Sequence, residues 1–292
     1  MRPEAARTPD DRFDGLLPYQ PRYLEWAGLR LHYLDEGSGA PVILFHGEPT
    51  WAYLYRKTVE TLLAAGHRVV VPDLPGFGRS DKPVDPGFYT YDRHVAAMAA
   101  VIEHLGLEEA TAVVHDWGGP IGLRLAVEHR RRFVRLCLLN TGLFTGAPMS
   151  DAFRAWRSFV EKSDDLPIGL IMRRSMARPW PDEVVAAYEA PFPAPEFKVG
   201  ARRFPLIVPM SPGDPGAEEM GEVMAALGSW DRPTLVLFSD ADPIFPTAVA
   251  ERLASHIPGA RSPEIVAGAG HFLQEDAGEQ VAARIAAFLA DG

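Results

Sequence analysis

The sequence predicts an α/β fold in which a mostly parallel, doubly wound sheet is interrupted by one helical insertion. Short apolar runs alternate with amphipathic stretches over residues 40–141 and again over 233–290. Parallel strands need crossover connections, which are usually helices, so this alternation favours a sheet covered on both faces. Residues 141–229 have helical periodicity and many prolines but no strand-like run. We therefore expect a core domain of residues 1–140 and 230–292 and a helical cap of residues 141–229.

The first half of the chain supplies most of the expected strands. The alternating stretch LRLHYLDEG, the turn GSGA and the apolar run PVILFHG predict a hairpin that leads into a buried strand. A helix is expected around Tyr55–Ala65, then the strand RVVVPDL, the loop PGFGRSDKP and a helix at Tyr91–Leu105. The stretch VVHDWGGPIG predicts a buried strand, a sharp turn and a helix, and VRLCLLNT predicts the next buried strand.

The second half begins with the expected cap and then returns to the sheet. The stretches DAFRAWRSFVEK and PDEVVAAYEAPF have helical patterns, and we interpret MSPGDPGAEEMGE as a flexible connector. The strand RPTLVLFSDADP, the helix AVAERLASHI, the short strand SPEIVAGAGH and the amphipathic helix GEQVAARIAAFLA follow. The expected sheet domain is therefore split by the cap.

Composition limits the classes of partner. A net charge of -10 and the lack of a basic cluster argue against nucleic acid and against anionic membranes. The single cysteine, Cys137, lies in an apolar run and is expected to be a small buried hydrophobe. The stretch MRPEAARTPDDRFDG lacks a signal-like apolar segment, and no run approaches the roughly 18 apolar residues of a membrane span. We expect a cytoplasmic monomer.

Three loop residues suggest a catalytic triad when they are considered together. Asp116 stands at the turn in VHDWG, where Gly118 and Gly119 are expected to permit a tight elbow; Asp242 follows an apolar strand, and His271 follows the last one. Each residue alone is more easily explained as a helix cap, a turn or a loop residue. Together they follow the nucleophile, acid, base order of α/β-hydrolases, and each lies at the carboxyl end of an expected strand, where ligands bind.

His115 precedes the elbow on the strand. Neighbouring side chains of a strand point to opposite faces, so we expect a structural role for His115.

Longer motifs resemble a known family. The stretches HYLDEG, HGEPTWAYLYRK, PDLPGFGRSDKP, VVHDWGGPIGL, AWRSF and GAGHFLQEDAGEQVA are similar to haloalkane dehalogenases, in particular to those with His-Gly-Glu-Pro-Thr-Trp after the strand. The resemblance runs from about Tyr19 to Leu289 and is weakest between Arg173 and Ser229. It implies an α/β-hydrolase fold with an inserted helical cap.

The resemblance also implies a two-step hydrolysis of a small haloalkane. Asp116 would displace the halide and form an alkyl ester, and His271, oriented by Asp242, would activate a water molecule against that ester. The indole N–H groups of Trp117 and Trp156 would bind the halide, because an indole donates and does not accept. The backbone N–H groups of Glu48 and Trp117 would form the oxyanion hole. The products would be an alcohol, a halide ion and a proton, and no cofactor or metal is expected.

Alternatives remain at several residues. Trp117 could be elbow packing, and Trp156 could be one apolar position of an amphipathic helix with Phe153 and Phe159. Trp51, Trp180 and Trp230 are interpreted as packing or pocket wall. His46-Gly47-Glu48 would suggest a zinc deaminase only with a Pro-Cys-x-x-Cys partner, which one cysteine cannot supply.

Three other functions are weighed. An epoxide hydrolase shares the aspartate and the histidine but is expected to use two cap tyrosines, and residues 141–229 contain one, Tyr188. A fluoroacetate-type dehalogenase would need cationic residues after the nucleophile, and DWGGP has none. The third alternative is a non-catalytic ligand-binding protein of the same fold. Such a protein would be expected to lack part of the set of site residues.

Overall fold

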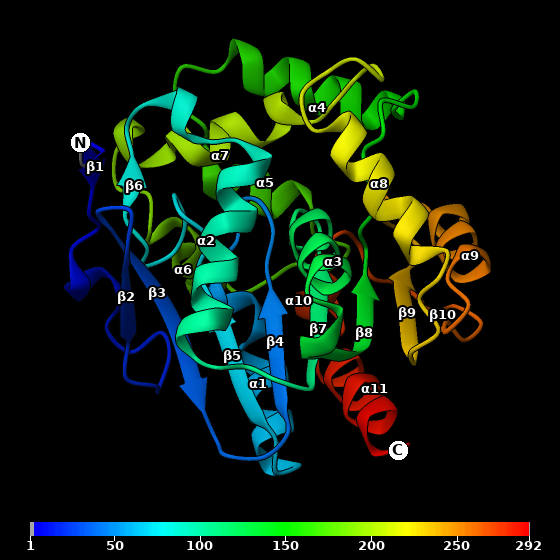
Figure 1. Ribbon diagram of the computed structural model, residues 1–292. Helices are drawn as coiled ribbons and strands as arrows, with labels where there is room; N and C mark the ends of the chain where they lie inside the picture. Colours follow the sequence, from blue (N-terminus) through cyan, green and yellow to red (C-terminus); the bar gives the residue numbers. More distant parts are fainter. Residues whose placement is uncertain (1–2, 292) are drawn as a thin grey trace.

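The computed structural model describes residues 3–291, which are organised around one eight-stranded sheet (Figure 1). Its strands are β2 (Arg22–Trp26), β3 (Leu29–Glu36), β4 (Pro41–Phe45), β5 (Arg68–Pro72), β7 (Ala110–His115), β8 (Phe133–Leu139), β9 (Thr234–Ser239) and β10 (Glu264–Val266). They lie in the order β10-β9-β8-β7-β4-β5-β3-β2. The six strands from β10 to β5 are parallel, and β3 pairs in an antiparallel manner with β5 on one side and with β2 on the other. The short strands β1 (Ala5–Ala6) and β6 (Lys82–Pro83) form a separate pair.

The expected hairpin between LRLHYLDEG and PVILF is wrong. β3 pairs with β2 on one side and with β5 on the other, so β5 lies between β3 and β4. The actual hairpin is β2–β3, whose two turn residues Ala27 and Gly28 both have positive φ, at 50° and 83°. Such turns fit the twist of paired strands. β2 was missed because its partly exposed pattern lacks an apolar run.

Helices cover both faces of the sheet. They are α1 (Arg56–Ala64), α2 (Tyr91–His104), α3 (Gly118–Glu128), α4 (Asp151–Lys162), α5 (Ile168–Arg174), α6 (Asp182–Glu189), α7 (Val199–Arg203), α8 (Ala217–Leu227), α9 (Thr247–His256), α10 (Leu273–Asp276) and α11 (Gly278–Ala290). In Figure 1, α2 and α3 lie in front of the sheet and α1 and α11 behind it. The predicted doubly wound sheet is confirmed. No helix within residues 3–291 is both long enough and apolar enough to span a membrane.

The middle of the sheet is the core of the molecule. Every residue of β7 and β9 is buried, because neighbouring strands and two helix layers enclose them. Such enclosure explains why these strands are continuous apolar runs and do not alternate. The buried strands β7 and β9 therefore end at the edge of the sheet where the candidate residues lie.

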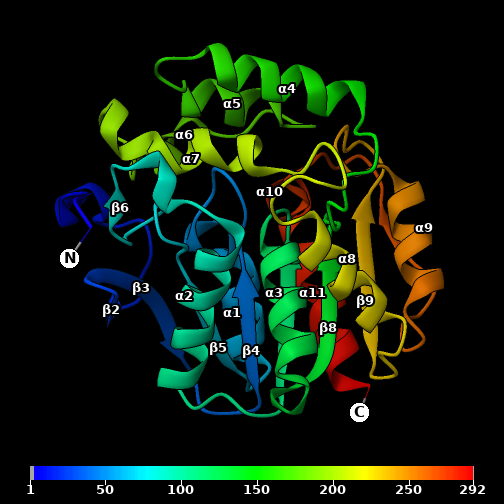
Figure 2. The same ribbon diagram turned by 45° about the horizontal axis from the view of Figure 1, so that its top comes forward.

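Four helices of the expected cap lie across that edge. Figure 2 shows α4 to α7 spread over the carboxyl ends of the parallel strands. The helix α8 instead packs against α3, which belongs to the layer over the sheet. We therefore propose that the cap ends before Ala217 and that α8 belongs to the core.

The connector prediction for MSPGDPGAEEMGE is wrong in its second half, since α8 begins at Ala217. The helix was not predicted because the Gly and Pro residues of this stretch are typical of turns. Gly216, with φ of 90°, precedes the first helical residue, and Glu218 and Glu219 stand in the first turn, where negative charge is favoured.

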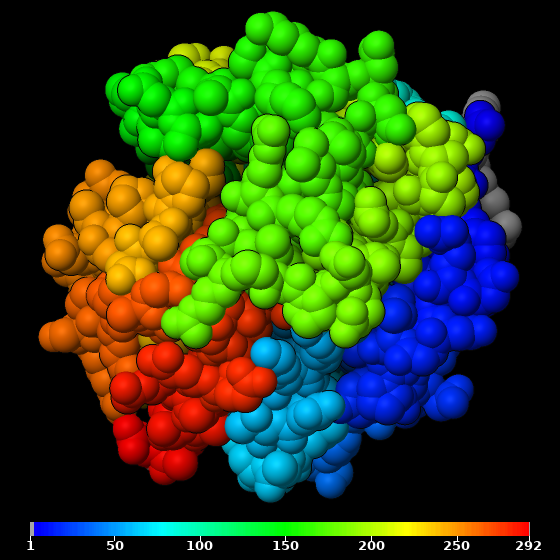
Figure 3. All heavy atoms as spheres, turned by 180° about the vertical axis from the view of Figure 1, so that it is seen from behind, coloured from blue at the N-terminus to red at the C-terminus, as the bar shows by residue number. Residues whose placement is uncertain are grey.

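Hydrogen bonds fix the cap to both ends of the chain. Seen from behind, the green cap extends from the blue N-terminal segment to the red C-terminal segment (Figure 3). Thr8 donates to the backbone oxygen of Pro191 at 2.8 Å, and the Trp180 indole donates to Asp276 at 2.8 Å. The cap is therefore a docked layer and not a loosely tethered one.

Candidate active site

Asp116 stands on a strained turn between β7 and α3. Its φ is 49°, which is costly for a residue with a Cβ. The backbone N–H of Asp116 donates to the backbone oxygen of Asn140 at 3.1 Å, and the Thr141 hydroxyl donates to the backbone oxygen of Asp116 at 2.7 Å. These bonds from the loop after β8 hold the elbow in place.

Gly118 and Gly119, which were expected to permit the tight elbow, contribute to it by lacking a side chain. Neither has a positive φ, which Asp116 carries. Glycine is required there because a Cβ on Gly118 would overlap the Phe45 backbone oxygen and a Cβ on Gly119 would overlap the Thr141 hydroxyl. The two glycines allow α3 to pack closely against the neighbouring strands.

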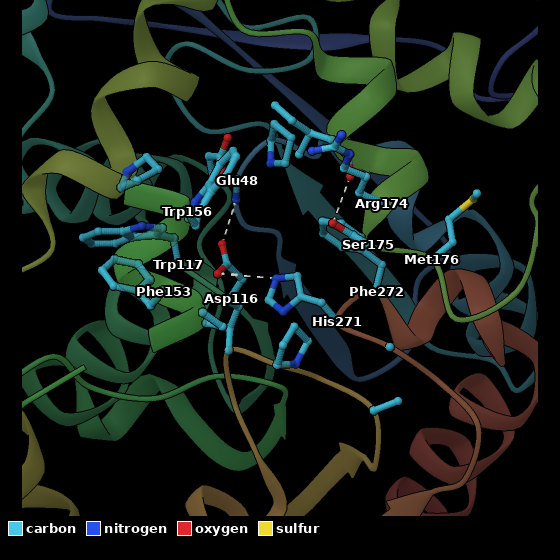
Figure 4. A pocket seen from close by; sticks show the side chains of 18 of the residues that line it. Glu48, Asp116, Trp117, Phe153, Trp156, Arg174, Ser175, Met176, His271 and Phe272 are labelled. Carbon is cyan, nitrogen blue, oxygen red and sulfur yellow. Dashed lines mark hydrogen bonds and ion pairs between the residues drawn. The ribbon is translucent and has the colours of Figure 1, made fainter. Parts of the chain in front are cut away.

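The structure brings the three expected triad side chains together. Asp242 lies in the loop after β9, and His271 lies in the loop after β10. The Nδ1 of His271 is 2.9 Å from the Oδ2 of Asp242, and its Nε2 is 3.6 Å from the Oδ2 of Asp116. Figure 4 shows the imidazole beside the Asp116 carboxylate. This arrangement can carry a nucleophile, a base and an orienting acid.

Burial and neighbouring charges shift the pKa of each triad residue. Burial lowers the pKa of His271, but the charge and hydrogen bond of Asp242, with the charge of Asp116, outweigh it and raise that pKa. Burial also opposes ionisation of Asp242, yet His271 and two backbone N–H groups lower its pKa overall. For Asp116, burial dominates and raises the pKa, although His271 and two backbone N–H groups oppose it.

Two backbone N–H groups are directed at the Asp116 carboxylate. The Glu48 N–H donates to Oδ1 at 2.8 Å, and the Trp117 N–H also hydrogen-bonds to this carboxylate. Glu48 lies in the loop after β4, and Trp117 lies between β7 and α3, so the neighbouring strands β4 and β7 position the two donors. The pair can stabilise negative charge on an oxygen of Asp116.

A cavity of about 440 Å³ opens in front of Asp116, beneath the cap. Its wall is largely apolar and includes Pro49, Phe144, Phe153, Ile171, Val208 and Phe272. Asp116 and His271 are among its polar lining residues. A pocket of this size and polarity suits a small apolar molecule.

Trp117 and Trp156 both line this cavity (Figure 4). Trp117 is almost fully buried, and Trp156 is half-buried on α4, stacked on Phe159 with 5.8 Å between ring centroids. Neither indole N–H has an acceptor among residues 3–291. By contrast, the Trp51 indole donates to the Ala187 oxygen at 3.0 Å, and that of Trp180 donates to Asp276. Trp117 and Trp156 thus keep donors free for a ligand, as the halide-binding prediction requires.

Tyr188, the one candidate for epoxide activation, lies elsewhere. It is fully buried outside the cavity, and its hydroxyl donates to the Oε1 of Glu275 at 2.5 Å. The Nη2 of Arg56 donates to the other oxygen of Glu275 at 2.8 Å. Tyr188 therefore joins the cap to the core and is not directed at the nucleophile, which weighs against an epoxide hydrolase.

Sequence reasoning missed the residues that hold the histidine loop. The Asn140 amide donates to the Ser239 hydroxyl at 2.7 Å and to the backbone oxygens of Gly270 and His271 at 3.1 Å each. The buried His115 also donates from Nε2 to the His271 oxygen, at 2.9 Å. His115 is structural, as expected, but its contact is the base loop itself. The position of Asn140 directly after β8, beside the nucleophile strand, is the signal that could have identified it.

Comparison with known proteins agrees with this geometry. Residues 40–177 match the family described as alpha/beta hydrolase fold. A haloalkane dehalogenase of Psychrobacter cryohalolentis is 45% identical over 298 residues, covering 98% of each chain. The chain belongs to the haloalkane dehalogenases. The resemblance and the α/β-hydrolase fold expected from the motifs are confirmed.

Two further proteins are similar to this haloalkane dehalogenase over nearly its whole length. The solved haloalkane dehalogenase DpaA of Paraglaciecola agarilytica superposes with a TM-score of 0.93 at 35% identity, covering 99% of each chain, and is described as tetrameric. A curated cis-3-alkyl-4-alkyloxetan-2-one decarboxylase of Shewanella oneidensis is 32% identical, covering 95% of this chain and 91% of that one.

Metal ligands were not expected at this site. Within residues 3–291, no three His, Cys, Asp or Glu side chains are arranged to hold a metal ion.

Proposed function

We propose that this haloalkane dehalogenase hydrolyses small haloalkanes to an alcohol, a halide ion and a proton, with Asp116 as the nucleophile. The observation that carries the proposal is the environment of the Asp116 carboxylate. Its Oδ1 accepts the Glu48 N–H at 2.8 Å, and its Oδ2 lies 3.6 Å from the Nε2 of His271 at the end of an apolar cavity. A carboxylate needs no prior deprotonation, unlike a serine hydroxyl.

In the first step, Oδ2 attacks the carbon that bears the halogen. The new carbon–oxygen bond makes an ester of Asp116, and the halide leaves with the electron pair of the broken bond. The indole N–H groups of Trp117 and Trp156 donate to the departing halide. Because the wall of the cavity is largely apolar, these two donors stabilise the developing charge more strongly than they would in water.

In the second step, His271 takes a proton from a water molecule, and the resulting hydroxide attacks the ester carbonyl carbon. The negative charge then develops on Oδ1, where the N–H groups of Glu48 and Trp117 stabilise it. Collapse of this intermediate releases the alcohol and restores the carboxylate, and His271 gives up its proton to solvent. Asp242 orients the imidazole and stabilises its charged form.

Bromide release from 1-bromobutane or 1,2-dibromoethane, followed together with pH, tests the proposal. Asp116→Ala should abolish release, while Tyr188→Phe, outside the cavity, should retain it. In His271→Ala the ester should persist, so intact-protein mass spectrometry should detect the added alkyl group on Asp116. Absence of that adduct in a folded variant would contradict the two-step scheme.

Matched substrates separate the competing activities. Opening of an epoxide without bromide release would indicate an epoxide hydrolase. Decarboxylation of a cis-3-alkyl-4-alkyloxetan-2-one would indicate the activity named for the Shewanella oneidensis relative. Inertness toward all three compounds would favour the non-catalytic alternative.

The assembly of the protein is a separate matter. The expected monomer does not fit the solved relative DpaA, whose structure is described as tetrameric. The substrate and water are the partners that the proposed reaction requires.

A further inference from the structure

Asp276 joins the loop of the proposed base to the cap. It is the last residue of α10, and it is half-buried. Its Oδ2 accepts the backbone N–H of Gly270 at 2.8 Å and that of Ala177 at 3.2 Å, and its Oδ1 accepts the indole N–H of Trp180 at 2.8 Å. Gly270 directly precedes His271, while Ala177 and Trp180 lie between α5 and α6 in the cap. One carboxylate thus bonds to both layers.

The base loop, residues 267–272 between β10 and α10, packs directly against this part of the cap. A Cβ on Gly270 would lie 2.9 Å from the backbone oxygen of Ser175 and 3.4 Å from the backbone nitrogen of Ala177. Gly270 and Ser175 also line the reaction cavity, as His271 does (Figure 4). Because the two backbones are so close, a carboxylate that bridges them determines how they meet beside the cavity.

The other hydrogen bonds of the base loop come from the core. Asn140 donates to the backbone oxygens of Gly270 and His271, and His115 donates to the His271 oxygen. Among the residues that the structure describes, the N–H of Gly270 has one acceptor, Asp276. Gly270 is buried, and a buried backbone N–H that loses its acceptor is costly. Without Asp276, the backbone next to His271 would therefore shift to find another partner.

The neighbouring acid Glu275 provides a comparison. Its carboxylate accepts hydrogen bonds from Arg56 of α1 and from Tyr188 of α6, and neither donor lies in the base loop. Glu275 and Asp276 both belong to α10, and both connect this helix to the cap. Only Asp276 also bonds to the base loop. The two acids therefore separate docking of the cap from placement of His271.

We propose that Asp276 is a positioning residue that holds His271 in place for hydrolysis of the ester, and that it acts through its hydrogen bond to the Gly270 N–H. The inference rests on the proposed function, because it assumes the two-step reaction. Asp276 is not one of the residues within 3–291 that line the cavity, so it acts through the loop and does not touch the substrate. Attack by Asp116 needs no base, whereas activation of water needs a correctly placed imidazole. Loss of Asp276 should therefore slow the second step selectively.

Single-turnover experiments with 1-bromobutane and excess enzyme follow the two steps separately. Bromide reports formation of the ester, and butanol reports its hydrolysis. In Asp276→Ala the rate of butanol formation should fall about tenfold or more, the effect of a displaced base, while the rate of bromide release should stay within about threefold of wild type. Intact-protein mass spectrometry should detect the ester that accumulates between the two steps. In the steady state, kcat and KM should fall together.

Three further variants are matched to this one. Asp276→Asn keeps one side-chain oxygen, which can still accept from Gly270, so it should recover most of the rate of butanol formation. Trp180→Phe and Tyr188→Phe each remove one hydrogen bond between the cap and α10 without altering the base loop. Both should keep the two rates within about threefold of wild type. Thermal unfolding of all four variants compares their stability.

Two kinds of result would overturn the inference. One is an Asp276→Ala protein in which butanol forms as fast as in wild type, or in which bromide release is slowed as much as butanol formation. The other is an equal loss in Tyr188→Phe, because docking of the cap would then explain the effect. If the wild-type protein releases no bromide, the proposed function itself fails, and that result is distinguishable because it does not involve the variants.

Discussion

Gly47→Ala should disable the nucleophile without removing any catalytic group. A Cβ at residue 47 would lie 2.6 Å from the Cγ of Asp116 and closer still to its Oδ1 and Cβ. Ordinary carbon–carbon contact is about 3.5–4.0 Å, so the carboxylate must move by roughly 1 Å. A displacement of that size in a reacting group can cost about 100-fold in rate. We therefore expect kcat for bromide release to fall about 100-fold or more.

The assay must separate displacement of the nucleophile from unfolding. Overpacking of this kind costs about 1–3 kcal/mol in stability, which denaturant unfolding of Gly47→Ala will measure. Gly221→Ala, on α8, is the matched control because its Cβ meets nothing within 4 Å. It should keep wild-type kcat and gain up to about 1 kcal/mol of stability. The reasoning fails if folded Gly47→Ala retains kcat within about threefold of wild type.

Three other outcomes are expected. Trp156→Phe should weaken bromide binding about tenfold or more in fluorescence titrations, whereas Phe159→Leu on the same helix should not; equal effects would refute a donor role. Single-turnover ester hydrolysis needs neutral His271, and Asp242 raises the pKa of that imidazole, so the rate of hydrolysis should fall as the pH decreases and the imidazole becomes protonated; a rate that does not fall with decreasing pH would contradict the role of His271 as base. Burial lowers the pKa of Lys82 from 10.5 to about 7, so the unfolded chain binds one more proton between these values. In urea titrations, wild-type stability should therefore rise with pH relative to Lys82→Met by up to about 1.4 kcal/mol per pH unit, and a parallel pH dependence would exclude this effect.

That Asp116, Asp242 and His271 lie together could be predicted from the sequence because their meeting depends on topology. Each of the three follows a parallel strand, and the ends of such strands meet at one edge of the sheet. The order of the strands along that edge was not predicted. The long parallel strands were predicted correctly because enclosure makes them continuously apolar.

Features that depend on contacts between distant segments could not be predicted. Nothing in the stretch around Tyr188 reveals that its hydroxyl bonds to Glu275. The β2–β3 hairpin was missed because a half-exposed edge pair has no apolar run, and α8 because Pro and Gly precede it.

The chain order of the triad bears on how the protein is made. Asp116 precedes the cap, while Asp242 and His271 follow it, and only the helices α10 and α11 come after His271 in the described residues. Domains generally fold from the N-terminus during synthesis. Residues 117–270 must therefore be synthesised before Asp116 and His271 can meet. On the proposed mechanism, a chain that stops before His271 would lack the base that hydrolyses the ester of Asp116.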